Sequence, residues 1–197
     1  MPRILLTAYE PYDDWQCNAS HLVLEQLQAS SAGQHEVTTR VYPVAFRTIH
    51  ELIQGELTGG YDFAIHMGQA PGYSDVTLEA IGINVAVDRG QKAEEGVPLV
   101  SGGAAAYQSP LPLSAWAAGL RTAGIPARVS YHAGTFLCNA ALYLSSYEAE
   151  QRRLKTKSVF LHLPLAAEQA EAHERGLPTL PAETMAGAVR WILRQLL

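Results

Sequence analysis

Short apolar runs alternate with amphipathic stretches along the chain, and this alternation constrains the fold more than any other feature of the sequence. The runs have the length of buried strands, and the stretches between them carry apolar residues at helical spacing. We expect strands over Arg3–Ala8, Val37–Val44, Asp62–Met67, Thr77–Val87, Ala127–Ser130 and Ser158–Leu163. We expect helices from Asn18 or Ser20 to Gln28, over Phe46–Leu57, Pro112–Ala123 and Phe136–Tyr147, and behind Pro181.

Strands separated by helices of this length favour a mostly parallel, twisted sheet with helices on both faces. No linker long enough to divide two domains interrupts the pattern, so we expect a single α/β domain over residues 1–197. Active sites in such sheets form beyond the carboxyl ends of the strands. The segments that follow the expected strands are Tyr9–Asn18, Gly68–Gly72, Asp88–Gly96, Ala133–Cys138 and His162–Pro164.

Charge and apolar content exclude several classes of function. With 48% apolar and 17% charged residues the chain has the composition of a folded protein, and its net charge of −5 argues against a general binder of phosphate backbones. No apolar stretch approaches the ~18 residues of a membrane span, and the N-terminus lacks a signal sequence. Two cysteines do not form a disulfide framework. We therefore expect a cytoplasmic protein that binds neither nucleic acid nor membrane.

Common cofactor and metal motifs are missing from the sequence. It contains no GxSxG, P-loop, GxGxxG or HExxH motif, and neither cysteine belongs to a CxxC pair. The seven histidines are scattered rather than placed at metal-ligand spacing. We therefore expect no cofactor and no metal.

Three residues have the chemistry of a nucleophile, a base and an orienting acid. Cys138 follows a loop of small residues at the start of an expected helix, where the macrodipole lowers a thiol's pKa. His162 ends an apolar strand, and Glu79 lies in an apolar stretch where a carboxylate needs a partner. A cysteine filling the core and a hydrogen-bonded core histidine are the other interpretations, and local sequence leaves them open. Composition alone does not show that the three residues meet.

The chain resembles the pyroglutamyl peptidase I (pyrrolidone carboxyl peptidase) family of cysteine peptidases from end to end. Leu6–Tyr12 is similar to the family's Thr-Gly-Phe-Glu-Pro-Phe motif, although Ala8-Tyr9 replaces Gly-Phe and Asp13-Asp14 replaces two glycines. The other matching segments are Asn18–Ser20, Ile65–Gly72, Leu78–Glu79, Ile83–Asn84, Ala133–Asn139 and Phe160–Pro164, the last followed by Glu168-Gln169. After Arg89, Gly90–Ala93 replaces the family's Ile-Pro-Asp-Asn.

The resemblance implies a hydrolase that removes an N-terminal pyroglutamyl residue from peptides through a thioester intermediate. Cys138 would be the nucleophile, His162 the base and Glu79 its orienting acid, with no cofactor or metal. Family members commonly form tetramers, so a homo-oligomer is expected, and their fold resembles that of purine phosphorylases.

The resemblance also implies the substrate pocket. Tyr9 and Tyr12 map onto the aromatic residues that hold the lactam ring, and Asn18 onto the asparagine of the same loop. Gln69 is expected to act through its backbone, and Phe136 and Leu137 to form the pocket's other wall. Arg89 would assist the oxyanion.

Two alternatives remain open. One is a non-catalytic homologue that binds pyroglutamyl or other lactam groups without turnover, and the other is a phosphorylase-like enzyme on the same fold. Turnover of a pyroglutamyl amide separates the first from a peptidase, and phosphate dependence separates the second.

Overall fold

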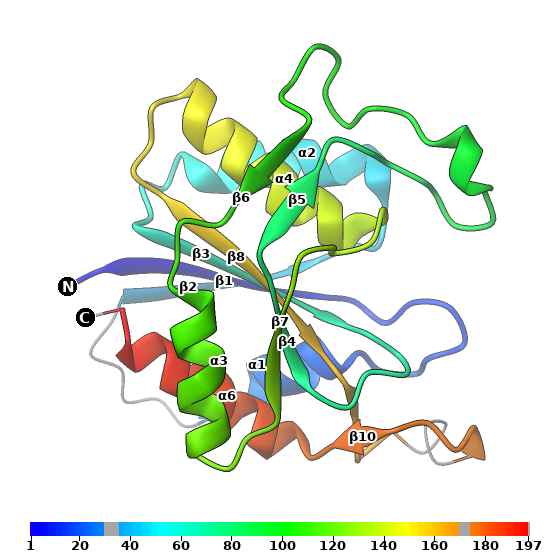
Figure 1. Cartoon of the computed structure of the whole chain (residues 1–197), viewed down its shortest axis with the longest axis vertical. Coiled ribbons are helices and arrows are strands. Elements are labelled where there is room, and N and C mark those ends of the chain that lie inside the picture. The colour runs from blue at the N-terminus through cyan, green and yellow to red at the C-terminus, as the bar shows by residue number, and fades with distance from the viewer. Residues whose placement is uncertain (30–35, 170–173, 197) are drawn as a thin grey trace.

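A six-stranded sheet runs through the middle of the molecule (Figure 1). The computed structural model describes residues 1–29, 36–169 and 174–196. The strands of this sheet are β1 (Arg3–Tyr9), β2 (Glu36–Tyr42), β3 (Phe63–Gln69), β4 (Val76–Glu79), β7 (Ala127–Ser130) and β8 (Lys157–Leu163), in the order β2-β1-β3-β8-β4-β7. The first four strands in this order are parallel, whereas β4 and β7 run antiparallel to β8. The predicted, mostly parallel α/β sheet is confirmed.

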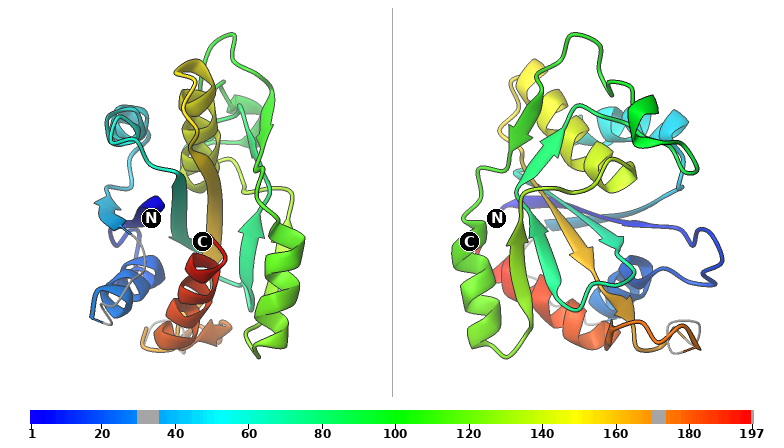
Figure 2. Two further views of the ribbon diagram at one scale, coloured as in Figure 1. Left: turned by 90° about the vertical axis from the view of Figure 1, so that its left-hand side faces the viewer. Right: turned by 45° about the vertical axis from the view of Figure 1, so that its right-hand side comes forward.

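Helices cover both faces of the sheet, as predicted (Figures 1 and 2). The helices are α1 (Ala19–Ala29), α2 (Phe46–Leu57), α3 (Leu113–Thr122), α4 (Leu137–Gln151) and α6 (Ala182–Arg194). Apolar side chains of α1, α3 and α6 share one core with the sheet, and those of α2 and α4 share a second core on the other face. Because β1, β3 and β8 lie between these two cores, they are buried on both faces and appear in the sequence as continuous apolar runs.

The expectation of one strand over Thr77–Val87 is wrong. The chain leaves the sheet after Glu79, and β5 (Ile81–Ile83) pairs antiparallel with β6 (Ala106–Gln108). The apolar run continues because β5 lies directly against α4, where a Cβ on Gly82 would approach the Tyr143 nitrogen to 2.7 Å. The other elements are η1 (Ala93–Glu95), β9 (Leu165–Ala166) and β10 (Thr179–Leu180).

The fold brings the carboxyl ends of β1, β3 and β8 to one edge of the sheet, together with the start of α4. Phe160 and His162 alternate with residues of the opposite core along β8, so both face the α4 side. No helix in the described ranges has the length and apolar character needed to cross a membrane.

Candidate active site

Cys138 lies in the first turn of α4, as the sequence predicts. The helix begins at Leu137, and the extended backbone of Phe136 is its N-cap, so the thiol lies beside the first amides of the helix, which have no partner within the helix. A Cβ on Gly68 would lie 3.1 Å from the Cys138 Sγ atom and 2.7 Å from the Phe160 ring. The missing side chain of Gly68 therefore lets the start of α4 approach β3 closely, and it leaves the partly buried thiol at the carboxyl edge of the sheet.

Glu79 and His162 form a buried hydrogen-bonded pair. The His162 Nδ1 atom lies 2.8 Å from the Glu79 Oε1 atom. The antiparallel register of β4 and β8 sets Glu79 opposite Phe160, which makes it the diagonal neighbour of His162 on the same face of the sheet. The carboxylate in this apolar stretch thus has the partner that its sequence context predicts. The rings of Tyr73 and Phe160 contact the imidazole with their edges or faces, at centroid distances of 5.6 and 4.9 Å.

The charges of its neighbours decide the protonation state of His162. Burial lowers the pKa of this imidazole, but the negative charge of Cys138, the hydrogen bond between the two side chains and the contributions of Glu79 raise it to about 9. Because Nδ1 is bonded to Glu79, Nε2 is the nitrogen that faces the thiol. His162 is therefore protonated at neutral pH, between the carboxyl group of Glu79 and the side chain of Cys138.

A small, largely apolar pocket of about 30 Å³ adjoins the thiol. Its lining residues are Tyr9, Tyr12, Asn18, Val44, Gly68, Gln69, Phe136, Leu137 and Cys138. Six of the seven predicted substrate-binding residues are therefore brought together around Cys138. The sequence interpretation missed Val44, and it included Gly68 only as part of a motif, because neither residue has a reactive group. Their positions near the ends of strands are the sequence signal that could have placed them in the pocket.

The polar groups of Tyr9 and Asn18 are used inside the protein. The Tyr9 hydroxyl donates to the Leu137 carbonyl at 3.1 Å, which ties the end of β1 to the start of α4. The Asn18 side chain caps α1 through its Oδ1 atom, 3.0 Å from the Ser20 nitrogen, and its Nδ2 donates to the Glu10 carbonyl. Both residues thereby fix the shape of the first loop.

Arg89 lies apart from this pocket. Its guanidinium pairs with Asp13 and lies 5.9 Å from the centre of the Tyr12 ring, so it bridges the loop after β1 and the loop after β5. Asp13 and Arg89 line a neighbouring, more open hollow of about 440 Å³. This hollow shares Tyr12, Val44 and Phe136 with the pocket. Sequence reasoning considered Asp13 and Arg89 separately and did not predict that they pair.

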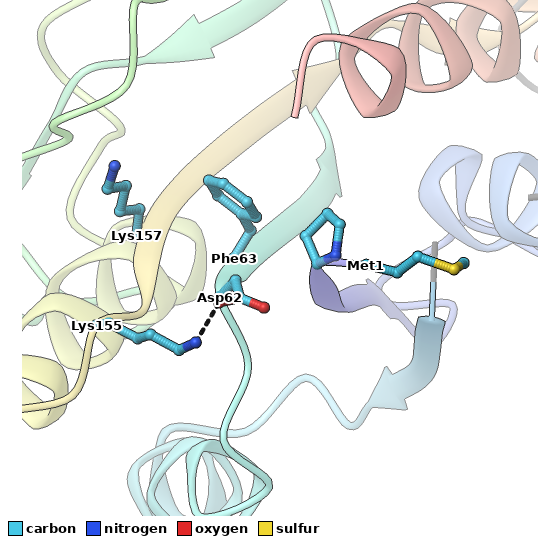
Figure 3. Close-up of a pocket in the computed structure, with 6 residues that line it drawn as sticks. Met1, Asp62, Phe63, Lys155 and Lys157 are labelled. Carbon is cyan, nitrogen blue, oxygen red and sulfur yellow. Dashed lines mark ion pairs between the residues drawn. The ribbon is translucent and has the colours of Figure 1, made fainter. Parts of the chain in front are cut away.

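Another hollow, of about 480 Å³, lies at the opposite end of the strands, where they begin (Figure 3). Met1, Asp62, Phe63, Lys155 and Lys157 line it, next to the amino ends of β1, β3 and β8, and Lys155 forms a 2.7 Å ion pair with Asp62. It is remote from the thiol. Across the described ranges, no group of three His, Cys, Asp or Glu side chains is arranged to hold a metal ion.

The α/β fold places a thiol at the start of α4 beside a buried histidine–carboxylate pair, which is the set of groups found in thiol-dependent hydrolases of the cysteine-peptidase class. A family model described as pyroglutamyl peptidase matches residues 2–195. The chain belongs to this family.

Several pyrrolidone-carboxylate peptidases are similar to this chain over most of its length, in sequence and in structure. A pyrrolidone-carboxylate peptidase of Erwinia tasmaniensis is 38% identical over 193 residues, which cover 94% of this chain and 88% of the relative. One from Enterobacter sp. (strain 638) is 36% identical over 195 residues, 96% of this chain and 90% of the relative. The crystal structure of pyrrolidone carboxyl peptidase from Pyrococcus furiosus has a TM-score of 0.89 at 32% identity, covering 98% of this chain and 96% of the other. The enzyme from Fervidobacterium islandicum AW-1 also gives 0.89, at 30% identity, over 100% and 98% of the two chains.

Proposed function

We propose that this protein hydrolyses the amide bond after an N-terminal pyroglutamyl residue of peptides, with Cys138 as nucleophile, His162 as general acid and base, and Glu79 as the orienting acid. The observation that carries the proposal is the position of His162, which lies between a buried carboxylate and a thiol at the start of α4. Membership of the pyroglutamyl peptidase family gives the substrate class.

Acylation follows from the protonation states of the pair. The Cys138 thiolate attacks the exocyclic carbonyl carbon of pyroglutamate, and the unpaired amides at the start of α4 stabilise the oxyanion. His162 then gives its proton to the nitrogen of the leaving peptide, the C–N bond breaks, and a pyroglutamyl thioester remains.

Deacylation reverses these roles. The neutral His162 takes a proton from a water molecule, which attacks the thioester carbonyl. The C–S bond breaks, pyroglutamate leaves, and the thiolate and imidazolium are restored. Glu79 stabilises the imidazolium and keeps its Nε2 atom toward the reacting atoms throughout.

The pocket suits a neutral ring. Aromatic walls from Tyr9, Tyr12 and Phe136 enclose a space with little charge. The ammonium group of an ordinary peptide N-terminus would lose its hydration there without gaining an ionic partner, whereas the uncharged lactam ring would not. Leu137 and Asn18 complete the wall. The contribution of Arg89 to the oxyanion stays a prediction, since its guanidinium is paired with Asp13.

By the same resemblance we propose that residues 1–197 form a single peptidase domain, and that the enzyme is a cytoplasmic homotetramer. Light scattering after size-exclusion chromatography measures the assembly. A mass other than four chains would contradict that part of the proposal without touching the chemistry.

The two cysteines provide the decisive test of the mechanism. With a chromogenic pyroglutamyl amide, Cys138→Ala should lower kcat/KM by at least about 10³-fold, because the reacting atom is removed. Cys17→Ala is the matched control and should stay within about threefold of the unmodified enzyme, since Cys17 is not among the residues that line the pocket and its backbone carbonyl, which accepts from Gln169, is kept. The reverse pattern would refute the assignment. No turnover by the unmodified protein would favour a lactam-binding homologue, and dependence on phosphate would favour a phosphorylase.

A further inference from the structure

Gln69 is the last residue of β3 and lines the pocket, and only the oxygen of its side-chain amide is hydrogen-bonded. The residue is 4% exposed, and its Oε1 atom accepts two hydrogen bonds, from the Ala19 nitrogen at 2.9 Å and from the Gln169 Nε2 atom at 2.9 Å. Its own Nε2 atom has no hydrogen-bond partner in the part of the chain that the structure describes. Buried donors without partners are rare, so this one calls for a ligand.

Gln169 determines which end of the Gln69 amide faces the pocket. Gln169 is 1% exposed, its Oε1 atom accepts the Ala166 N–H at 2.7 Å, and its Nε2 atom donates to the Cys17 carbonyl at 3.1 Å. Backbone groups cannot exchange donor and acceptor roles, so these two bonds fix the orientation of the Gln169 amide.

The orientation of Gln169 is passed on to Gln69. If the Gln69 amide were reversed, its NH₂ group would meet two other donors, the Ala19 N–H and the Gln169 NH₂. The network therefore holds Oε1 away from the pocket and leaves the NH₂ group as the free end.

The free end lies next to Tyr12, another residue of the pocket lining. Burial, followed by the charge of Cys138, raises the pKa of the Tyr12 phenol, and the charge of Arg89, followed by the polar contact with the Gln69 side chain, lowers it. The amide N–H groups are thus directed toward the Tyr12 hydroxyl. Because they complete no hydrogen bond there, they remain available to an acceptor that enters the pocket.

We propose that the Gln69 Nε2 atom donates a hydrogen bond to the ring carbonyl of the substrate's lactam, and that Gln169 is the positioning residue that holds it in this orientation. The inference rests on the proposed function, and it gives the Gln69 side chain a role beyond the backbone role that the family resemblance implies. A proline ring has the same size but no carbonyl. A site built to hydrogen-bond a substrate group discriminates strongly against an analogue that lacks the group.

Gln169→Glu tests the positioning role with little change in shape. A carboxylate still accepts from the Ala166 nitrogen but cannot donate to Gln69, which frees the Gln69 amide to reverse. We expect KM for a pyroglutamyl amide to rise at least about tenfold, with kcat within about threefold. The KM ratio of variant to unmodified enzyme should decrease as the pH is lowered from about 8 to about 6. Burial raises the pKa of the introduced carboxyl group, and its protonated form can again donate a hydrogen bond to Gln69. A folded variant with unchanged KM would overturn the positioning role.

Gln28→Leu is the matched control for removal of an amide. Gln28 is exposed on α1 and donates to Thr39, remote from the pocket, so this variant should behave as the unmodified enzyme. Gln69→Leu removes the proposed donor itself, and it decides the question if Gln169→Glu does not fold.

Protection of Cys138 from iodoacetamide by 2-pyrrolidone measures lactam binding without turnover. Protection should need at least about tenfold more 2-pyrrolidone in Gln69→Leu and Gln169→Glu than in the control. If the unmodified protein shows this Gln69-dependent protection but no turnover, the proposed function fails and the inference stands. If turnover is normal and Gln69→Leu matches the control in KM and protection, the inference is wrong and the function stands. Absence of both turnover and protection would defeat both.

Discussion

His162 shows how two neighbours reverse the effect of burial on one side chain. Removal from water favours a neutral imidazole, yet the charge of Cys138 and the hydrogen bonds to Cys138 and Glu79 raise the pKa to about 9. In the proposed mechanism the protonated form gives its proton to the leaving amine. The activity of the unmodified enzyme should therefore decline as pH rises through about 9, where His162 loses this proton.

Glu79→Gln should move this alkaline decline of kcat/KM to lower pH. The carboxylate stabilises the imidazolium, so its removal lowers the pKa of His162, and the loss of orientation should also reduce kcat. The measurement is the pH profile of kcat/KM for a pyroglutamyl amide. Glu148→Gln is the matched control, because Glu148 pairs with His50 at the same 2.8 Å distance and neither residue lines the pocket. An unchanged profile in Glu79→Gln would refute the role of Glu79.

At the scale of elements, the Asp13–Arg89 pair joins the loop after β1 to the loop after β5. Both loops border the hollow next to the pocket, and the Arg89 guanidinium lies over the ring of Tyr12, the neighbour of Asp13 in the first loop. Exposed ion pairs contribute only about 0–1 kcal/mol to stability, so the consequence of this one concerns loop position rather than folding.

Asp13→Asn should raise KM for a pyroglutamyl amide about two- to fivefold, while kcat and Tm change little. The physical reason is that Tyr12 loses the partner that holds its loop against the pocket. Asp14→Asn is the control, because Asp14 is more exposed and faces Arg175 at 3.4 Å instead. Steady-state kinetics in low and high salt provide the check, since screening should weaken the unmodified enzyme toward the variant. Equal effects of the two substitutions would contradict the bridge.

The elements that the sequence predicts well include an edge strand and an amphipathic helix as well as the buried central strands. The strand expected over Ala127–Ser130 and the helix over Phe46–Leu57 coincide with β7 and α2, and the central strands differ by a residue or two. The split between β4 and β5 could not be predicted. The split accompanies the close contact of Gly82 with the backbone of α4. This contact arises from tertiary packing and leaves the apolar pattern of the sequence unbroken, so no local feature of the sequence reveals it.

The site was predictable where chemistry and motif coincide, and hidden where partners are distant in sequence. Family resemblance supplied Cys138, His162 and Glu79, but the diagonal register that joins the last two depends on β4 running antiparallel to β8. The amide chain from Gln169 to Gln69 connects residues 100 positions apart, and no local pattern indicates it.

For the whole molecule, a second buried histidine links three elements of the core. His66 of β3 hydrogen-bonds to Thr7 of β1 at 2.8 Å and to Ser145 of α4 at 2.7 Å. It is fully buried, and burial lowers its pKa to about 3. His66 therefore stays neutral in the folded protein over the range where a histidine in an unfolded chain, with a pKa of about 6.5, takes up a proton.

The two buried histidines should act on folding stability with opposite sign. Below about pH 6.5 the unfolded chain binds a proton at His66 that the folded protein does not bind until about pH 3, so stability falls as the solution becomes more acidic. The His162 contribution is complete below about 6.5 and is lost as pH rises toward about 9, because its folded pKa is the raised one. These two terms place the stability maximum near about pH 6.5.

His66→Gln should lower the free energy of unfolding at neutral pH by about 1–3 kcal/mol, because the Thr7 and Ser145 hydroxyls lose well-placed partners. The same substitution removes the titrating group, so its unfolding free energy should decline less steeply than that of the unmodified protein between about pH 6 and about pH 4. Urea unfolding across this range measures both effects. His21→Gln is the control, since His21 is partly exposed on α1 and contacts Glu25 only at 3.9 Å. A His66→Gln protein with an undiminished acid slope would show that carboxylates, rather than His66, govern acid unfolding.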